Sequence, residues 1–170
     1  MNEQDNVGIV DIETLRKLDL IPPLNRMRRG SVAVVECVEE IPCDVCVAAC
    51  PVHAITKEDI NSIPRVDFDK CTGCGSCLLA CPGLAIFLVD LSTNNGKGRV
   101  TIPYELLPIP IKGERVTLLD RRGEPIGEGK VVKVIKSADK TYAVTIEIEE
   151  DKIMEVRFFR VIKNENSLSL

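Results

Sequence analysis

The hydrophobic and polar positions change their period along this chain of 170 residues. Near the start, Ile12, Leu15 and Leu18 recur at helical spacing behind Asp11, a favourable N-cap residue, which predicts a short helix. Towards the C-terminus the pattern alternates with period two and is rich in β-branched residues, which predicts antiparallel strands. We expect these strands over residues 115–119, 130–135, 141–148 and 153–159.

A strand–loop–helix–strand pattern occurs twice between these two ends. The first copy runs from Val32 to Ile55 and the second from Arg65 to Ile86, and the copies are 31 residues apart when Cys50 is aligned with Cys81. Two such β-α-β copies predict one small α+β unit with approximate two-fold symmetry.

The changes in pattern divide the chain into five segments. We expect a helical and basic docking segment (1–30), a cysteine-bearing domain (31–92), a Pro-rich linker (93–113), a small antiparallel β-barrel or sheet module (114–163) and a tail (164–170). The basic character of the first segment comes from Arg26, Arg28 and Arg29. The predicted fold class is α+β.

Composition and charge exclude several classes of protein. With 45% hydrophobic and 28% charged residues, wholesale disorder is excluded. No apolar run reaches the roughly 18 residues that a membrane span needs, and the acidic, polar start is unlike a secretory signal. We therefore expect a cytoplasmic protein. A net charge of −4 gives no general reason to expect binding to nucleic acid or to an anionic membrane.

The cysteines carry the chemistry. All eight lie between Cys37 and Cys81, whereas a secreted disulfide scaffold would spread its crosslinks along the chain. Clustered thiols in a reducing compartment indicate metal or redox chemistry. The second copy reads Cys-x2-Cys-x2-Cys-x3-Cys-Pro, and in this spacing three thiolates surround one iron–sulfur cube while the fourth ligates another. Gly73 and Gly75 are expected to let backbone amides approach the sulfurs closely.

On this motif, residues 31–92 resemble a bacterial-type ferredoxin that carries two [4Fe–4S] clusters. The resemblance implies a (βαβ)2 fold and crossed ligation by the two copies. One cluster is expected on Cys71, Cys74, Cys77 and Cys50, and the other on Cys43, Cys46, Cys81 and one further residue. The motif covers about a third of the chain.

The fourth ligand of that other cluster is where the first copy departs from the family's spacing. Glu40 occupies the usual ligand position, and the nearest upstream cysteine is Cys37, which gives Cys-x5-Cys-x2-Cys-x3-Cys-Pro. We expect Cys37 to complete the site because a thiolate is a softer iron ligand than a carboxylate. The alternative is that Cys37 is a buried strand residue and that the cluster has three irons or a carboxylate ligand.

These features predict electron transfer without a catalytic site on this chain, since no dinucleotide fingerprint, nucleophile triad or paired carboxylates are found. The segments that flank the cysteine domain favour a fixed subunit over a free shuttle. The layout is similar to small ferredoxin subunits of flavin-dependent amino-acid dehydrogenase complexes, such as those acting on proline or hydroxyproline. This similarity implies a flavoprotein catalytic subunit as partner in a hetero-oligomeric complex.

The cysteine-bearing domain is predicted to be acidic. Residues 31–92 hold nine acidic against three basic side chains, which is expected to give an acidic docking face.

Two alternatives to an oxidoreductase subunit stay open. One alternative is a free-standing ferredoxin shuttle. The other is a zinc-stabilised protein that binds nucleic acid. Against zinc, its sites usually place ligands as separate Cys-x2-Cys pairs, and the near-neutral C-terminal segment lacks a row of stacking aromatic residues.

Overall fold

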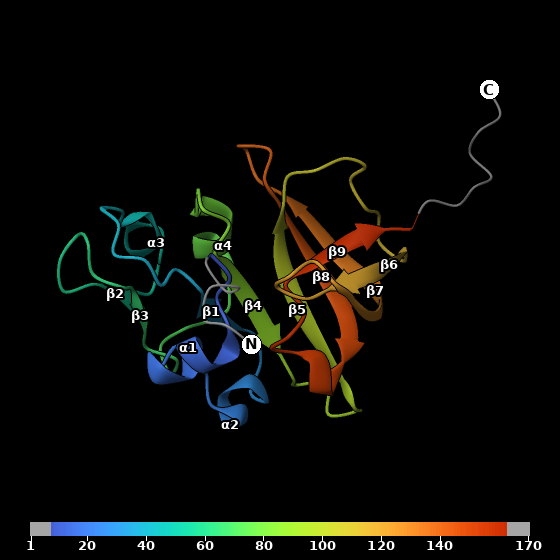
Figure 1. Ribbon diagram of the computed structural model, residues 1–170, viewed down its shortest axis with the longest axis horizontal. Coiled ribbons are helices and arrows are strands. Elements are labelled where there is room, and N and C mark those ends of the chain that lie inside the picture. Colours follow the sequence, from blue (N-terminus) through green and yellow to red (C-terminus); the bar gives the residue numbers. More distant parts are fainter. Residues whose placement is uncertain (1–7, 163–170) are drawn as a thin grey trace.

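The computed structural model describes residues 8–162, which consist mostly of strands with a few short helices (Figure 1). The helices are α1 (Ile12–Lys17), α2 (Leu24–Met27), α3 (Val45–Ala48) and α4 (Ser76–Ala80), with a 3-10 turn, η2 (Glu150–Lys152). None of the helices in this part of the chain has the length and apolar character to cross a membrane.

One seven-stranded antiparallel sheet dominates the fold, with the strand order β1-β4-β5-β8-β7-β6-β9. Its strands are β1 (Val32–Val35), β4 (Ile86–Asp90), β5 (Lys97–Tyr104), β6 (Arg115–Leu119), β7 (Pro125–Lys136), β8 (Tyr142–Glu149) and β9 (Phe158–Val161). A separate antiparallel pair consists of β2 (Ile55–Thr56) and β3 (Arg65–Val66).

The two sequence copies fold as β1-α3-β2 and β3-α4-β4. Strands β1 and β4 pair with Val35 opposite Ile86, and β2 and β3 pair with Ile55 opposite Val66. Each copy therefore contributes one strand to each pair. In Figure 1 this half of the molecule lies beside the large sheet, with β1 and β4 between the two parts.

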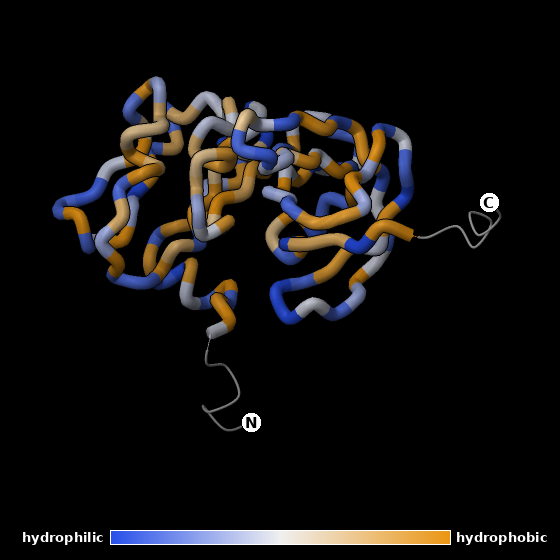
Figure 2. Tube along the Cα trace, turned by 90° about the horizontal axis from the view of Figure 1, so that it is seen from above, coloured by the Kyte–Doolittle hydropathy of each residue, from blue (hydrophilic) through white to orange (hydrophobic). Residues whose placement is uncertain are grey.

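Strand β1 is buried on both faces because it separates two hydrophobic cores. Val32 and Val34 face the larger core, which the C-terminal strands fill. Ala33 and Val35 face a smaller core that includes buried cysteines. Both halves of the chain accordingly contain apolar stretches when seen from above (Figure 2). Burial on both faces accounts for the continuous apolar run of β1 where a half-exposed strand would alternate.

The segment 93–113 differs from the expected linker because it contains β5. This strand pairs with β4 on one side and along its whole length with β8 on the other. Val100, Ile102 and Tyr104 alternate into the core, a pattern that the neighbouring prolines obscure in the sequence. Pro103 lies beyond the last residue paired with β4, Thr101, so the proline's missing N–H is tolerated there.

The C-terminal strands also differ from the expectation in two ways. They continue the sheet of the cysteine domain, and within residues 8–162 that sheet has β1 and β9 as edges and does not close into a barrel. The strand expected over 153–159 begins only at Phe158. Ile153 and Val156 are buried from a helical turn, where residues three apart share a face.

The N-terminal segment packs on its own chain. Asp11 caps α1, as its position predicted, by accepting a 2.7 Å hydrogen bond from the Thr14 N–H. The three arginines expected to form a basic docking surface have partners within the chain. Arg26 is buried, Arg28 pairs with Glu150, and Arg29 pairs with Asp69.

A buried ion-pair cluster joins the cysteine domain to the C-terminal strands. Glu36 follows β1, and its Oε1 accepts hydrogen bonds of 2.6 Å each from Arg157 Nε and Arg121 Nη2. Burial lowers the pKa of Arg157 to about 10 and the charge of Glu36 opposes this shift, so the guanidinium stays protonated at neutral pH. The Arg157 guanidinium also lies 5.0 Å from the centroid of the Phe87 ring in β4.

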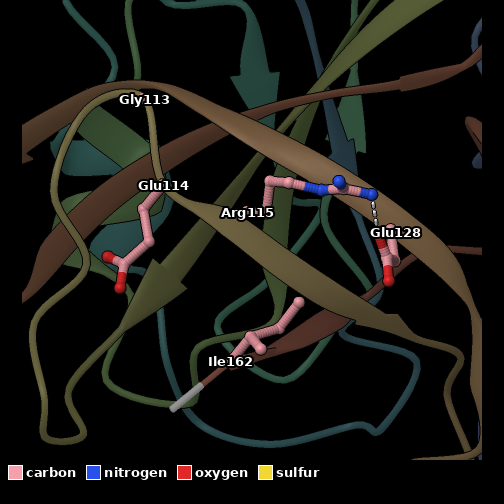
Figure 3. Close-up of a pocket in the computed structure, with 5 residues that line it drawn as sticks. All are labelled: Gly113, Glu114, Arg115, Glu128 and Ile162. Carbon is pink, nitrogen blue, oxygen red and sulfur yellow. Dashed lines mark hydrogen bonds and ion pairs between the residues drawn. The ribbon is translucent and has the colours of Figure 1, made fainter. Parts of the chain in front are cut away.

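We predict that Glu36→Gln destabilises the protein by about 3 kcal/mol, because removing the carboxylate leaves the buried Arg157 guanidinium without its counter-charge. The measurement is the urea midpoint of the cluster-loaded protein under anaerobic conditions. The control is Arg115→Gln, which removes the exposed pair of Arg115 with Glu128 (Figure 3) and should cost less than about 1 kcal/mol. Equal losses in the two variants would contradict the stabilising role of the buried cluster.

Candidate metal centre

All eight cysteines are free thiols that lie in and around the two short helices of the repeat. Cys46 is in α3, Cys77 is in α4, and Cys81 is the C-cap of α4. Because α3 and α4 pack against each other, the cysteines of one copy lie close to those of the other.

The thiols fall into two groups of four. Three cysteines of the second copy and one of the first form what we call the second group: Cys50, Cys71, Cys74 and Cys77. All four line one cavity. Burial, followed by the charges of the other three thiols, raises the pKa of Cys77 to about 12. Three members come from the second copy and one from the first, so the structure brings together the four residues that the family resemblance grouped.

The remaining four thiols form a first group, which we define as Cys37, Cys43, Cys46 and Cys81. Burial raises the pKa of Cys37, and the charge of Cys81 is the next largest cause. The pKa of Cys46 is raised by the same two causes in the same order, and Cys43 adds to both shifts. Cys37 therefore lies among these thiols, whereas the side chain of Glu40 is exposed.

The chemistry of both donor sets fits an iron–sulfur cluster. Thiolates crowded in a poorly solvated space repel one another, which is why burial and neighbouring charges raise the pKa values of Cys37, Cys46 and Cys77. A cationic iron–sulfur core offsets that repulsion, and thiolates are the ligands that hold such cores. Binding would therefore release the thiol protons.

Polar groups approach the sulfurs of the second group. The Ala54 N–H donates to Cys50 Sγ at 3.2 Å, and the Ala33 N–H donates to Cys71 Sγ at 3.5 Å. Cys74 is exposed, and its Sγ lies 3.4 Å from Ser76 Oγ. Burial raises the pKa of Cys74, but hydrogen bonds with Ser76, Thr72 and the Cys74 backbone together outweigh it, and the net shift is downward. Such contacts help to set the reduction potential of a cluster.

Gly73 permits a close approach of the cysteine loop to β1. Its φ is +66°, and a Cβ at this position would lie 2.3 Å from the Ser31 carbonyl oxygen. The group that excludes a side chain at position 73 is thus the Ser31 backbone just before β1. The sequence instead predicted a close contact with a cysteine sulfur. Gly75, with φ +86°, is the N-cap residue of α4, and its Cβ would meet nothing closer than 3.6 Å.

Two cations near the cysteines were not singled out from the sequence as site residues. Arg26 Nη2 donates to the Cys71 carbonyl at 2.6 Å, and Lys57 Nζ donates to the Cys43 carbonyl at 2.6 Å. Each cation therefore holds the backbone of one cysteine loop, although the two cysteines are not equivalent in the repeat, since Cys43 aligns with Cys74. No sequence signal distinguishes Arg26 from the exposed arginines beside it, because its role depends on contacts with residues more than 40 positions away.

Comparison with known proteins assigns the cysteine-bearing region. Residues 36–85 match the family described as a 4Fe-4S dicluster domain. The chain is 40% identical over 60 residues to the ferredoxin-type protein NapF of Haemophilus influenzae, a match that covers 34% of each chain. It is 31% identical over 81 residues to the polyferredoxin-like subunit of an aliphatic sulfonate oxidoreductase of Pyrococcus furiosus, covering 46% of this chain and 42% of the relative.

A third relative is the beta subunit of a dissimilatory-type sulfite reductase of Archaeoglobus fulgidus, 44% identical over 48 residues, or 28% of this chain and 13% of the relative. The chain thus spans about a third to two fifths of the first two relatives and less of the third. No match to a solved structure was found. Residues 36–85, which contain all eight cysteines, are a 4Fe-4S dicluster domain with two [4Fe–4S] clusters as its cofactors.

Proposed function

We propose that this chain is an electron-transfer subunit of an oxidoreductase complex, which passes electrons through its two [4Fe–4S] clusters between a catalytic subunit and an acceptor. The observation that carries the proposal is the pair of four-thiol groups on two helices in contact. This arrangement makes a short path for electrons within one rigid unit. The similarity to ferredoxin-type proteins and to oxidoreductase subunits supports the same conclusion.

The proposed ligands follow the two groups. The first group holds one cluster and the second group holds the other, so each copy of the repeat lends one cysteine to its neighbour. Thiols of the same group raise the pKa values of Cys37, Cys46 and Cys77, which supports this division. The exposure of Glu40, compared with the half-buried Cys37, supports the thiolate as the fourth ligand of the first cluster.

The protein's own contribution is to hold the clusters and to adjust their potentials. When bound, the clusters supply sites that accept and release one electron at a time. The N–H groups of Ala54 and Ala33 point at thiolates of the second group and stabilise negative charge there. The buried Leu78 and Ile86 in the smaller core exclude water from the space between the helices and β4.

An exposed apolar surface favours a subunit over a free shuttle. The loop between β5 and β6 exposes Leu106, Leu107 and Ile111, with 83% of Leu107 accessible. Beside it lies a pocket lined by stacked aromatic rings, of which Tyr104 and Phe159 have centroids 4.7 Å apart. Contiguous apolar surface of this kind marks protein–protein contacts. We propose that the catalytic subunit covers it, and that this subunit carries a flavin and acts on an amino acid of the proline type.

We predict eight iron atoms per chain, four in each cluster. Cys50→Ser should damage the cluster held by Cys71, Cys74 and Cys77, although Cys50 is closer in sequence to the ligands of the other cluster. The measurements are iron analysis and electron paramagnetic resonance of anaerobically purified protein. About four irons in the unmodified chain would contradict the two-cluster arrangement.

We predict that Cys37→Ser converts the first cluster to a three-iron form or abolishes it, because the hydroxyl is a poorer iron ligand than the thiolate. Glu40→Ala is the control and should leave both clusters intact. Iron content and the magnetic resonance signal of three-iron centres are the readouts. The reverse pattern would show that Glu40 supplies the fourth ligand.

We predict that the double variant Leu107→Asp and Ile111→Asp keeps its iron but no longer co-purifies with the catalytic subunit. Charged side chains on a surface that another chain covers remain unpaired and desolvated. Ile135→Asp, at an exposed apolar position on β7, is the matched control and should retain the complex. An intact complex in the double variant would contradict docking at this loop, and an unmodified complex without flavin would contradict the flavoprotein partner.

A further inference from the structure

Arg26 is a buried cation beside the second group of cysteines. It lies in α2, and only 8% of its surface is accessible. The side chains of its neighbours Arg28 and Arg29 both reach solvent. Burial of a guanidinium is unfavourable unless other groups replace its hydration. The contacts that replace it therefore indicate what the residue does.

Backbone carbonyl groups around the cysteine loop satisfy the guanidinium. Its Nε donates to the Phe68 carbonyl at 2.6 Å, and its Nη1 donates to the Gly30 carbonyl at 3.0 Å. Nη2 donates to two carbonyls at once, that of Ser31 at 3.1 Å and that of Cys71 at 2.6 Å. Arg26 thus fixes the backbone of Cys71 to the residue that precedes β1.

These hydrogen bonds place the charge but do not neutralise it. Among residues 8–162, Arg26 forms no ion pair with a carboxylate, whereas the other buried arginine, Arg157, pairs with Glu36. A four-thiolate [4Fe–4S] site carries a net charge of about −2 when oxidised, and thiolates with this core are negative in both oxidation states. The cluster is therefore the counter-charge that the buried guanidinium lacks.

We propose that Arg26 is a positioning residue that holds the Cys71 loop and, through its unpaired charge, raises the reduction potential of the cluster bound by the second group. This inference rests on the ligand assignment under the proposed function. Reduction adds one electron from the redox partner to the cluster, without a proton, and makes the site more negative by one charge. A nearby cation in a poorly solvated environment stabilises that reduced form.

Lys57 provides the internal comparison. Its ammonium donates to the carbonyl of Cys43, a member of the first group, and also to the Ile60 carbonyl at 2.6 Å. The contact with Ile60 is exposed, so water screens the Lys57 charge more than that of Arg26. The charge of Arg26 consequently biases the distribution of an electron between the two clusters towards the second.

The experiment is a redox titration with dithionite, followed by electron paramagnetic resonance, on the full chain loaded with both clusters. Signals are assigned to each cluster with the Cys50→Ser and Cys37→Ser variants. Arg26→Gln should lower the potential of the second cluster and leave that of the first unchanged. Arg26→Lys retains the charge and should keep the potential of the second cluster close to that of the unmodified protein.

Lys57→Gln is the matched control and should not change the potential of the second cluster. Unchanged potentials in Arg26→Gln, or an equal decrease in Arg26→Lys, would overturn the charge role of Arg26. If Arg26→Gln fails to hold the second cluster, the potential of that cluster in Arg26→Lys is the deciding measurement. A lowered potential in Arg26→Lys contradicts the proposal, and an unchanged one supports it. A shift confined to the first cluster would instead contradict the ligand assignment, and unmodified protein without reducible clusters would contradict the proposed function.

Discussion

The carboxylate of Glu36 joins the cluster-binding half of the molecule to the C-terminal strands. It lies one residue before Cys37, its backbone N–H donates to the Ala85 carbonyl at 2.8 Å, and its side chain is held by Arg121 and Arg157. Because these interactions are buried, a movement of the C-terminal strands would break them or carry the Cys37 loop along. The geometry of the first cysteine group thus depends on residues about 120 positions away.

Contacts between residues far apart in the sequence also give the two cysteine groups different surroundings despite the internal repeat. The second group receives backbone N–H donors at Cys50 and Cys71, and a buried guanidinium holds its loop. The first group has the solvent-accessible Lys57 on the Cys43 carbonyl, and the buried cluster of Glu36 with Arg121 and Arg157 lies nearby. The internal repeat therefore produces two sites with chemically distinct surroundings.

The continuous sheet also explains why the strands beyond residue 93 are more than an attachment to a ferredoxin. Strand β5 pairs with β4 on one side and with β8 on the other, so the larger core forms only when both halves are present. The exposed loop after β5 is then presented from a rigid sheet. A partner docked there would contact a surface fixed relative to the clusters, which favours a constant distance for electron transfer.

The sequence by itself determined the features that depend on local spacing. The cysteine motif, the repeat, the N-cap of α1 and most of the C-terminal strands could be predicted because each reflects neighbours within a few residues. The tertiary structure alone decided that Lys97–Tyr104 would be an interior strand and that β1 would share one sheet with β4 to β9. It alone buried Arg26 beside Cys71 and Glu36 beside Arg157, because hydrogen-bond partners so far apart in sequence leave no periodic pattern.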